Sequence, residues 1–343
     1  MKQRKPFFQT IWNWLKKFPV FMSLFVVVPV TIYSGLYVFS PEFVYQNLFY
    51  SGVSLKLNVE DFKLTNIKPL FSIMDISSFS NYQGGTCYSN YYVLCSNNFE
   101  CILIYNMDNN NVEHTIFTNA TNTEYHCNTC FFGPSFYSSV DKFPILYISM
   151  ENEGVETTYG YRIYNNGGTM EIMQVQALHL VCDNNEKIYL PNSYYDYDSD
   201  LLYYAGYTKN SYMKSDDNFL RYYAFYMPDF RLAEYDLHYN DAVKTFDLPS
   251  ETATQGGFIS DSYLYQTFSF NSDTDPLRTP KMRIVDLDKE KIVYDNQNLG
   301  LLGVYDEFEN IAGCYNHHIY GFGVKTLKVF DFEYIDTVLE GNS

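Results

Sequence analysis

The chain has 343 residues, of which 46% are apolar and 18% charged, and 40 acidic against 23 basic side chains give it a formal charge of −17. This length and apolar content suffice for one large or two ordinary folded domains and exclude a disordered chain. The acidic surface repels phosphate backbones, which argues against nucleic-acid binding. Aromatic residues make up 19% of the chain, with 35 Tyr and 28 Phe but only 2 Trp, and this composition favours β-sheet.

A basic segment and an uncharged apolar run open the chain. Residues 1–17 contain five basic side chains and no acidic one, and residues 18–39 carry no charge. As a helix, these 22 residues extend about 33 Å, which matches the hydrocarbon core of a bilayer. The pattern predicts an uncleaved transmembrane helix. A cleaved signal peptide is the main alternative, but the run exceeds the usual h-region and lacks an A-x-A-like exit. A buried core helix is the third, and it would normally show a polar stripe.

The distribution of charge predicts the orientation of this helix. Five positive charges precede it, whereas residues 41–343 carry 18 basic and 40 acidic side chains, a net charge of −22. By the positive-inside rule, the N-terminus is cytoplasmic and the large domain lies outside the cell membrane. The predicted organisation is a cytoplasmic basic segment (1–17), a transmembrane helix (18–39), a linker with a candidate ring-closing strand (40–72) and an extracytoplasmic domain (73–343).

Seven cysteines in an exported domain would ordinarily form disulfides, but the odd number requires at least one free or intermolecular thiol. Cys127 and Cys130, preceded by His126, form a C-x-x-C motif, which serves in redox exchange or as half of a zinc site. The context favours neither, because Cys130 runs into Phe-Phe-Gly-Pro, typical of a strand and turn, and no second C-x-x-C follows. Half-buried strand cysteines are the preferred interpretation, with redox and zinc chemistry as alternatives.

A strand-and-turn phrase recurs in the outer domain, in which alternating apolar residues end at an Asn or Asp that opens a polar turn. Its five copies end at Asn106, Asn165, Asp229, Asp286 and Asp331, at intervals of 59, 64, 57 and 45 residues. These intervals are slightly above the ~40–50 residues of a four-stranded propeller blade. An aromatic strand precedes each copy, at residues 91–94, 144–149, 201–205, 263–265 and 318–321. Further apolar stretches follow several copies, at residues 112–117, 170–178, 291–294 and 334–339.

A Gln-Gly-Gly sequence marks a further strand upstream of the aromatic one. It occurs at Gln83 and at Gln255, 172 residues apart, or about 57 residues for each of three units. Glycine pairs suit the innermost strand of a blade, because a side chain there would collide with the neighbouring blade. Helical periodicity is nearly absent after residue 55. The sequence therefore predicts an all-β fold, a propeller of five four-stranded blades, or of six if residues 54–72 and the C-terminus form another. A β-sandwich is the chief alternative.

This arrangement resembles the TolB-like, WD40-shaped propellers that gut-type and other anaerobic bacteria export. The resemblance covers residues 75–340 and is carried by the Gln-Gly-Gly units, by His126-Cys-Asn-Thr-Cys-Phe-Phe-Gly133 and by Asp141-Lys-Phe-Pro-Ile-Leu-Tyr-Ile-Ser149. It implies a propeller fold and an extracytoplasmic scaffold, with no reaction attached. Lipoprotein members of that group carry a cysteine just after the apolar run, whereas the first cysteine here is Cys87. Lipid anchoring is therefore not implied.

Aligning the units by their aromatic strand places a polar residue near the start of each inner strand. These residues are Gln83, His126 with Asn128, Asn192, Gln255 and Asn310. The starts of inner strands converge on the mouth of a propeller's central channel, where amides and an imidazole offer donors and acceptors to a polar ligand. We therefore predict a ligand-binding ring at this mouth. The alternative is that these side chains bond to the backbone of neighbouring blades.

A second candidate site lies at Asp196, Asp198 and Asp200, whose alternation in a loop could gather oxygen atoms around Ca²⁺. The match is partial, because no Gly stands at the turn position and no Glu at the closing one; no other cofactor is expected. Motifs for nucleophilic, zinc-hydrolase or nucleotide chemistry are absent from the sequence. The predicted function is a membrane-anchored propeller that binds a protein, peptide or glycan outside the cell. A surface glycan hydrolase or lyase with its site at the channel mouth is the alternative.

Overall fold

The computed structural model describes residues 62–75, 77, 81–118, 126–152, 155–182, 187–269, 280–296, 298–303, 306–313 and 318–335. The predicted cytoplasmic segment 1–17 and transmembrane helix 18–39 lie outside these residues. Within the described ranges, none of the helices has the length and hydropathy to cross a bilayer. The strands belong to one compact unit, Gly52–Tyr137 with Asp141–Ser343; of the other unit, Met1–Ser51 with Ser138–Val140, only the latter segment is described.

Antiparallel strands form five sheets, which we number as blades 1 to 5 in chain order. Blade 1 contains β2 (Tyr82–Tyr88), β3 (Tyr91–Ser96), β4 (Cys101–Asn106) and β5 (Asn111–Phe117). Blade 2 contains β6 (His126–Phe132), β7 (Leu146–Asn152), β8 (Val155–Asn166) and β9 (Thr169–Val181). Blade 3 contains β10 (Tyr189–Asp196), β11 (Leu201–Tyr207), β12 (Phe219–Tyr226) and β14 (Lys244–Pro249). Blade 4 contains β15 (Thr254–Ser260), β16 (Tyr263–Phe268), β17 (Lys281–Asp286) and β18 (Lys291–Asn296). Blade 5 contains β19 (Phe308–Gly313), β20 (Ile319–Gly323), β21 (Lys328–Ile335) and β1 (Lys63–Ser72).

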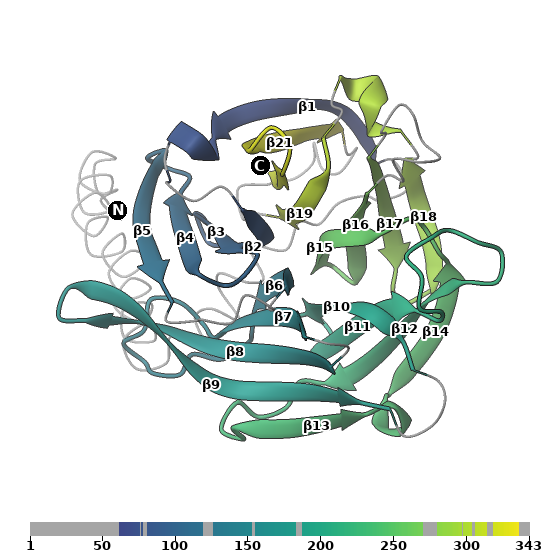
Figure 1. Cartoon of the computed structure of the whole chain (residues 1–343), viewed down its shortest axis with the longest axis horizontal. Helices are drawn as coiled ribbons and strands as arrows, with labels where there is room; N and C mark the ends of the chain where they lie inside the picture. The colour runs from purple at the N-terminus through teal and green to yellow at the C-terminus, as the bar shows by residue number, and fades with distance from the viewer. Residues whose placement is uncertain are drawn as a thin grey trace, which may run out of the picture. The chain divides into compact units, whose positions relative to one another are not determined.

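The first strand of each blade faces a common centre (Figure 1). In the order β2, β6, β10, β15 and β19, each inner strand contacts the next, and β19 contacts β2 to close the ring. The predicted all-β propeller with five four-stranded blades is thereby confirmed. The alternative of six blades is wrong, because β1 pairs with β21 and supplies the outer strand of blade 5. Tyr334, expected to begin that outer strand, lies in β21 instead.

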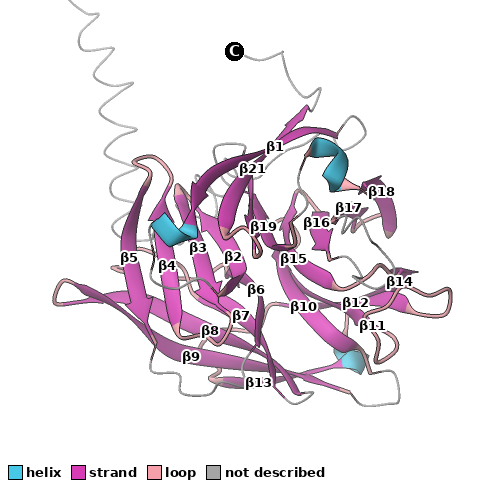
Figure 2. Cartoon of the chain, turned by 45° about the horizontal axis from the view of Figure 1, so that its top comes forward, coloured by secondary structure: helices cyan, strands magenta, loops and turns pink. Residues whose placement is uncertain are grey.

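Blade 2 gains a fifth strand from the chain of blade 3. Between β12 and β14, strand β13 (Glu234–His238) runs parallel to β9 and pairs with it (Figure 2). The amide of Gln176 in β9 donates hydrogen bonds to the carbonyls of Asp229 (2.9 Å) and Leu232 (3.0 Å), just before β13. His179 lies 2.6 Å from the carboxylate of Glu234. This connection therefore ties two adjacent blades together at their outer edges. Short 3-10 turns occupy Ile73–Asp75, Tyr239–Asp241 and Leu299–Leu302.

Apolar side chains fill the space between every pair of neighbouring blades. Five core clusters lie between blades 1 and 2, 2 and 3, 3 and 4, 4 and 5, and 5 and 1. Many of the large buried side chains are tyrosines, whose hydroxyls need partners inside the core. Tyr147 donates to Gln176 at 2.7 Å, Tyr204 to Thr158 at 2.9 Å, and Tyr222 to Gln266 at 3.0 Å. Aromatic faces and satisfied hydroxyls together hold the blades in the ring.

Crowding by blade 5 accounts for Gly85 and Gly256, as predicted, but not for Gly84. A Cβ on Gly256 would overlap the Cα of Asn310 and lie 2.8 Å from the carbonyl oxygen of Glu309, both in blade 5. A Cβ on Gly85 would lie 2.5 Å from Cγ of the same Asn310. Gly84 is different, because its nearest atom, Sγ of Cys130, would be 3.5 Å away. Gly256 of blade 4 therefore lies too close to the backbone of blade 5 to carry a Cβ, and Gly85 of blade 1 lies too close to the side chain of Asn310.

Candidate functional site: the cavity at the channel mouth

Every inner strand contains a β-bulge near its start. The register shifts fall between Tyr82 and Gly85 in β2, Cys127 and Cys130 in β6, Tyr189 and Asn192 in β10, Thr254 and Gly257 in β15, and Phe308 and Asn310 in β19. A bulge leaves an extra residue outside the hydrogen-bonded ladder and re-aims its side chain. The five bulges therefore present one additional side chain per blade at the same level of the ring.

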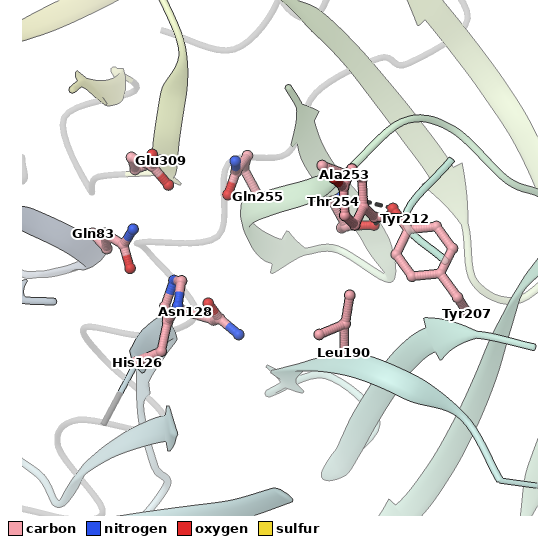
Figure 3. A pocket seen from close by; sticks show the side chains of 10 residues that line it. All are labelled: Gln83, His126, Asn128, Leu190, Tyr207, Tyr212, Ala253, Thr254, Gln255 and Glu309. Carbon is pink, nitrogen blue, oxygen red and sulfur yellow. Dashed lines mark hydrogen bonds between the residues drawn. The ribbon is translucent and has the colours of Figure 1, made fainter. Parts of the chain in front are cut away.

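These bulge residues enclose a cavity of about 170 Å³. Each blade contributes one of them to the wall, namely Gln83, Asn128, Leu190, Gln255 and Glu309. The wall is completed by His126, Tyr207, Tyr212, Ala253 and Thr254. Figure 3 shows Gln83, His126, Asn128, Gln255 and Glu309 around one space, with Leu190 on the opposite side. The cavity is much larger than the ~10–15 Å³ that one water needs and smaller than the ~300–1,000 Å³ that encloses a drug-sized ligand.

Four of the six residues predicted for the ligand-binding ring line this cavity: Gln83, His126, Asn128 and Gln255. Asn192 and Asn310 do not. They are only 2% and 1% exposed. Asn192 donates to the carbonyl of Gln255 at 3.1 Å, and Asn310 donates to the carbonyl of Gln83 at 2.5 Å. They tie blade 3 to blade 4 and blade 5 to blade 1. These two side chains therefore follow the alternative interpretation, in which they bond to the backbone of a neighbouring blade.

Replacing Asn310 with alanine should lower the free energy of unfolding by about 1–3 kcal/mol. Asn310 also accepts a hydrogen bond from the buried hydroxyl of Tyr92, so the change leaves this hydroxyl and the partly buried carbonyl of Gln83 without their partner. Replacing the exposed His126 with alanine should change the free energy of unfolding by no more than ~0.5 kcal/mol. Urea denaturation of the two variants measures both effects. An equal loss of stability in the two variants would contradict the conclusion that Asn310 holds two blades together whereas His126 only lines the cavity.

The residue that sequence reasoning missed is Glu309, next to the predicted Asn310. Glu309 is 7% exposed, and burial, together with the neighbouring carboxylates of Glu307 and Asp306, raises its pKa from an ordinary 4.5 to about 8. No hydrogen bond is among the causes of this shift, and Lys325 is the positive charge that opposes it. A charged residue inside the otherwise buried strand β19 was the available signal, but the bulge that turns it toward the cavity leaves no trace in the sequence.

Carboxylates behind the cavity wall fix the direction of one amide. Nε2 of Gln255 donates to Oε1 of Glu307 at 3.2 Å, and Ser269 donates to the same oxygen. Because its nitrogen is engaged, Gln255 is left with its oxygen as a further acceptor. Asp306 accepts hydrogen bonds from the backbone N–H groups of Glu307 (2.8 Å) and Lys325 (2.9 Å). This carboxylate therefore holds the start of β19 against the turn that joins β20 to β21.

Two cavity residues adopt a left-handed backbone conformation without being glycine. Leu190, in the bulge of β10, has φ 51°, and Ala253, just before β15, has φ 22°. For a bulky residue such as leucine this conformation costs free energy, of the order of 1–3 kcal/mol for a sparsely populated region. Strain of this kind persists where the surrounding structure holds it, and it is concentrated at binding and active sites.

The C-x-x-C motif lies in the core between blades 1 and 2. Residues three apart on a regular strand face opposite sides of the sheet, but the bulge in β6 turns Cys127 and Cys130 into the same cluster. Both are buried and not disulfide-bonded, and burial raises the pKa of both thiols well above the ordinary value. Thiols that stay protonated and inaccessible suit neither redox exchange nor zinc binding. The predicted unpaired thiols are confirmed at Cys95, Cys101, Cys127 and Cys130, whereas Cys87 is disulfide-bonded.

The aspartates of the predicted calcium loop bond within their own turn, between β10 and β11. The buried carboxylate of Asp196 accepts hydrogen bonds from the backbone N–H of Asp198 (3.1 Å) and the hydroxyl of Ser199 (2.7 Å). Asp200 accepts one from Tyr195. In the described ranges, no three His, Cys, Asp or Glu side chains are grouped as metal ligands. Calcium binding by this loop stays a prediction.

Comparisons with known proteins do not place the sequence in a family. No protein-family model and no curated protein matches the chain. Similar solved structures include the PQQ-bound aldose sugar dehydrogenase of Streptomyces coelicolor, with a TM-score of 0.45 and 9% identity over 80% of this chain and 99% of that one. Glutaminyl cyclase of Myxococcus xanthus has a TM-score of 0.45 and 8% identity over 80% and 97%. The nidogen/laminin complex has a TM-score of 0.35 and 14% identity over 65% and 64%. Likeness at this level brings no ligand or reaction to this chain.

Proposed function

We propose that this chain is a ligand-binding propeller whose site is the cavity at the channel mouth. The single observation that carries the proposal is the convergence of one bulge residue from each of the five blades on that cavity. A bulge interrupts pairing and re-aims a side chain, and bulges are over-represented at the rims of barrels and next to active sites.

The ligand of such a cavity is a small polar molecule or one polar group of a protein, peptide or glycan. We further propose that residues 18–39 anchor the propeller in the cell membrane and that the propeller lies outside the cell. This part of the proposal rests on the uncharged run, on the five basic residues before it and on the net charge of −22 after it. The TolB-like resemblance agrees with an exported scaffold of this kind.

A panel of small probes tests the binding proposal. We expect the full-length protein to bind at least one of glucose, 1-butanol, butyrate and n-butylamine at millimolar concentration, measured by saturation-transfer NMR. Replacing His126 with alanine should weaken that binding, whereas replacing His114, on the outer strand β5, should not. Binding by none of the probes, or equal binding by both variants, would contradict a site in the cavity.

One observation favours a second candidate function, catalysis on glycans. A carboxyl group with a pKa of about 8 holds its proton at neutral pH, which is the state of a general acid, and His126 lines the same cavity. A glycan hydrolase or lyase with Glu309 as the acid would turn over nitrophenyl glycosides, and the Glu309→Gln variant would not. Turnover that is unchanged in this variant would place any such activity elsewhere.

A further inference from the structure

The cavity is rich in hydrogen-bond acceptors. The carboxyl group of Glu309 is one of them, and Oε1 of Gln83 is buried without a hydrogen-bond partner in the described part of the chain. Gln255 adds the oxygen of an amide whose nitrogen is already bonded to Glu307. These three acceptors come from blades 5, 1 and 4 and lie on one side of the cavity (Figure 3). An occupant that satisfies them must bring several donors.

The charges around Glu309 favour a cation over a neutral or anionic donor. From the segment before its own strand come the carboxyl groups of Glu307 and Asp306, and from the turn between β20 and β21 comes Lys325, whose Nζ lies 3.8 Å from Glu307. His126 of β6 lines the same cavity. Three carboxyl groups therefore face one lysine, which is itself beside Glu307. A negative potential of this kind repels anions and attracts cations.

We propose that the cavity binds a primary ammonium group on a short apolar stem, with Glu309 as its counter-ion and Gln83 and Gln255 as its other acceptors. A primary ammonium group has three N–H donors and no acceptor, which matches three acceptors from three blades. Leu190 and Tyr212 give the cavity an apolar side for the stem. The inference rests on the proposed function, since it names the ligand class of the same cavity.

Binding of such a cation is coupled to loss of the Glu309 proton. Burial keeps this carboxyl group protonated up to about pH 8, whereas an adjacent ammonium group favours the ionised carboxylate. Below that pH one proton therefore moves from Glu309 to the solvent as the cation binds. The affinity should rise by up to about tenfold per pH unit between pH 6 and 8 and level off above, because Glu309 is then already ionised.

The test compares n-butylamine with its neutral analogue 1-butanol on the full-length protein. We expect the amine to bind at least tenfold more tightly than 1-butanol at pH 8. Calorimetry in two buffers at pH 7 should show that a proton is released when the amine binds. The Glu309→Gln variant should bind the amine at least tenfold more weakly than the wild type. Gln83→Met, which keeps the size of the side chain but removes the acceptor, should weaken binding of the amine and leave binding of 1-butanol unchanged. A lysine side chain carries the same group, so acetyl-Gly-Lys-Gly-amide distinguishes a peptide ligand from a free amine.

Different failures have different meanings in this experiment. If glucose, butyrate or 1-butanol binds in a His126-dependent way as tightly as the amine, the ammonium inference is overturned and the binding cavity is retained. If the amine binds without proton release and equally well to Glu309→Gln, Glu309 is not its counter-ion and the inference is overturned as well. If no probe of either set binds, both proposals fail.

Discussion

Replacing Gly256 with alanine is expected to destabilise the propeller by about 3 kcal/mol or more, because overpacking of a close-packed core costs ~1–3 kcal/mol and the obstacle here is backbone. The new methyl group would overlap the Cα of Asn310 and lie 2.7 Å from its Cβ. Asn310 cannot retreat, since its side chain is fixed by Tyr92 and by the carbonyl of Gln83. Blades 4 and 5 would have to separate.

The matched control is Gly84→Ala, at the equivalent position of the other Gln-Gly-Gly sequence. The added Cβ would lie 3.5 Å from Sγ of Cys130, an ordinary van der Waals contact. A compatible Gly→Ala change also lowers the entropy of the unfolded chain, so the net effect should stay within about 1 kcal/mol. Urea denaturation of both variants checks the difference. Similar denaturation midpoints for Gly84→Ala and Gly256→Ala would show that crowding does not explain the glycine at position 256.

The second large effect is on the pH dependence of stability. The carboxyl group of Glu309 has an ordinary pKa of 4.5 when unfolded and a pKa of about 8 when folded. Between these values the folded state binds more protons than the unfolded state, so stability falls as pH rises. The slope from this group reaches about 1.4 kcal/mol per pH unit and vanishes above about pH 8. Glu309→Gln carries no titrating group, and its stability should fall far less over this interval.

Denaturant midpoints at pH 5.5, 7 and 8.5 in the absence of ligand measure this effect. The difference between the wild type and Glu309→Gln should grow in favour of the variant as pH rises. Asp216→Asn, at an exposed carboxyl group in the loop between β11 and β12, serves as the control and should follow the wild type at each pH. Parallel curves for the wild type and Glu309→Gln would contradict a buried, proton-holding carboxyl group in the cavity.

The number of blades and the order of their strands could be predicted from the sequence because each blade repeats the same pattern. The aromatic strands and the phrases that end in Asn or Asp became the second and third strands of every blade. The paired glycines indicated where blades approach most closely. Long-range pairing could not be predicted in the same way. A ring-closing strand was expected within residues 40–72, but its place beside β21 as the outer strand of blade 5, and that of β13 beside β9, depend on contacts between distant segments, which leave no local pattern.

The candidate site was predicted to within one or two residues, and the bulges explain the error. An extra residue inside a strand does not interrupt an apolar pattern, so the alternation of faces appears to continue through it. Counting from the aromatic strand therefore selected Asn310 where Glu309 lines the cavity, and Asn192 where Leu190 does. The same bulge in β6 turns both cysteines of the C-x-x-C motif inward, which a regular strand would not do.

A crystal structure of the full-length protein with n-butylamine at pH 8 would show whether the five bulges build a binding site. We expect density for the amine in the cavity, with its nitrogen within hydrogen-bonding distance of Glu309 and Gln83 and its stem toward Leu190. Only water in the cavity at a saturating concentration of the amine, or the amine bound elsewhere on the propeller, would contradict the claim that the five bulges build a binding site.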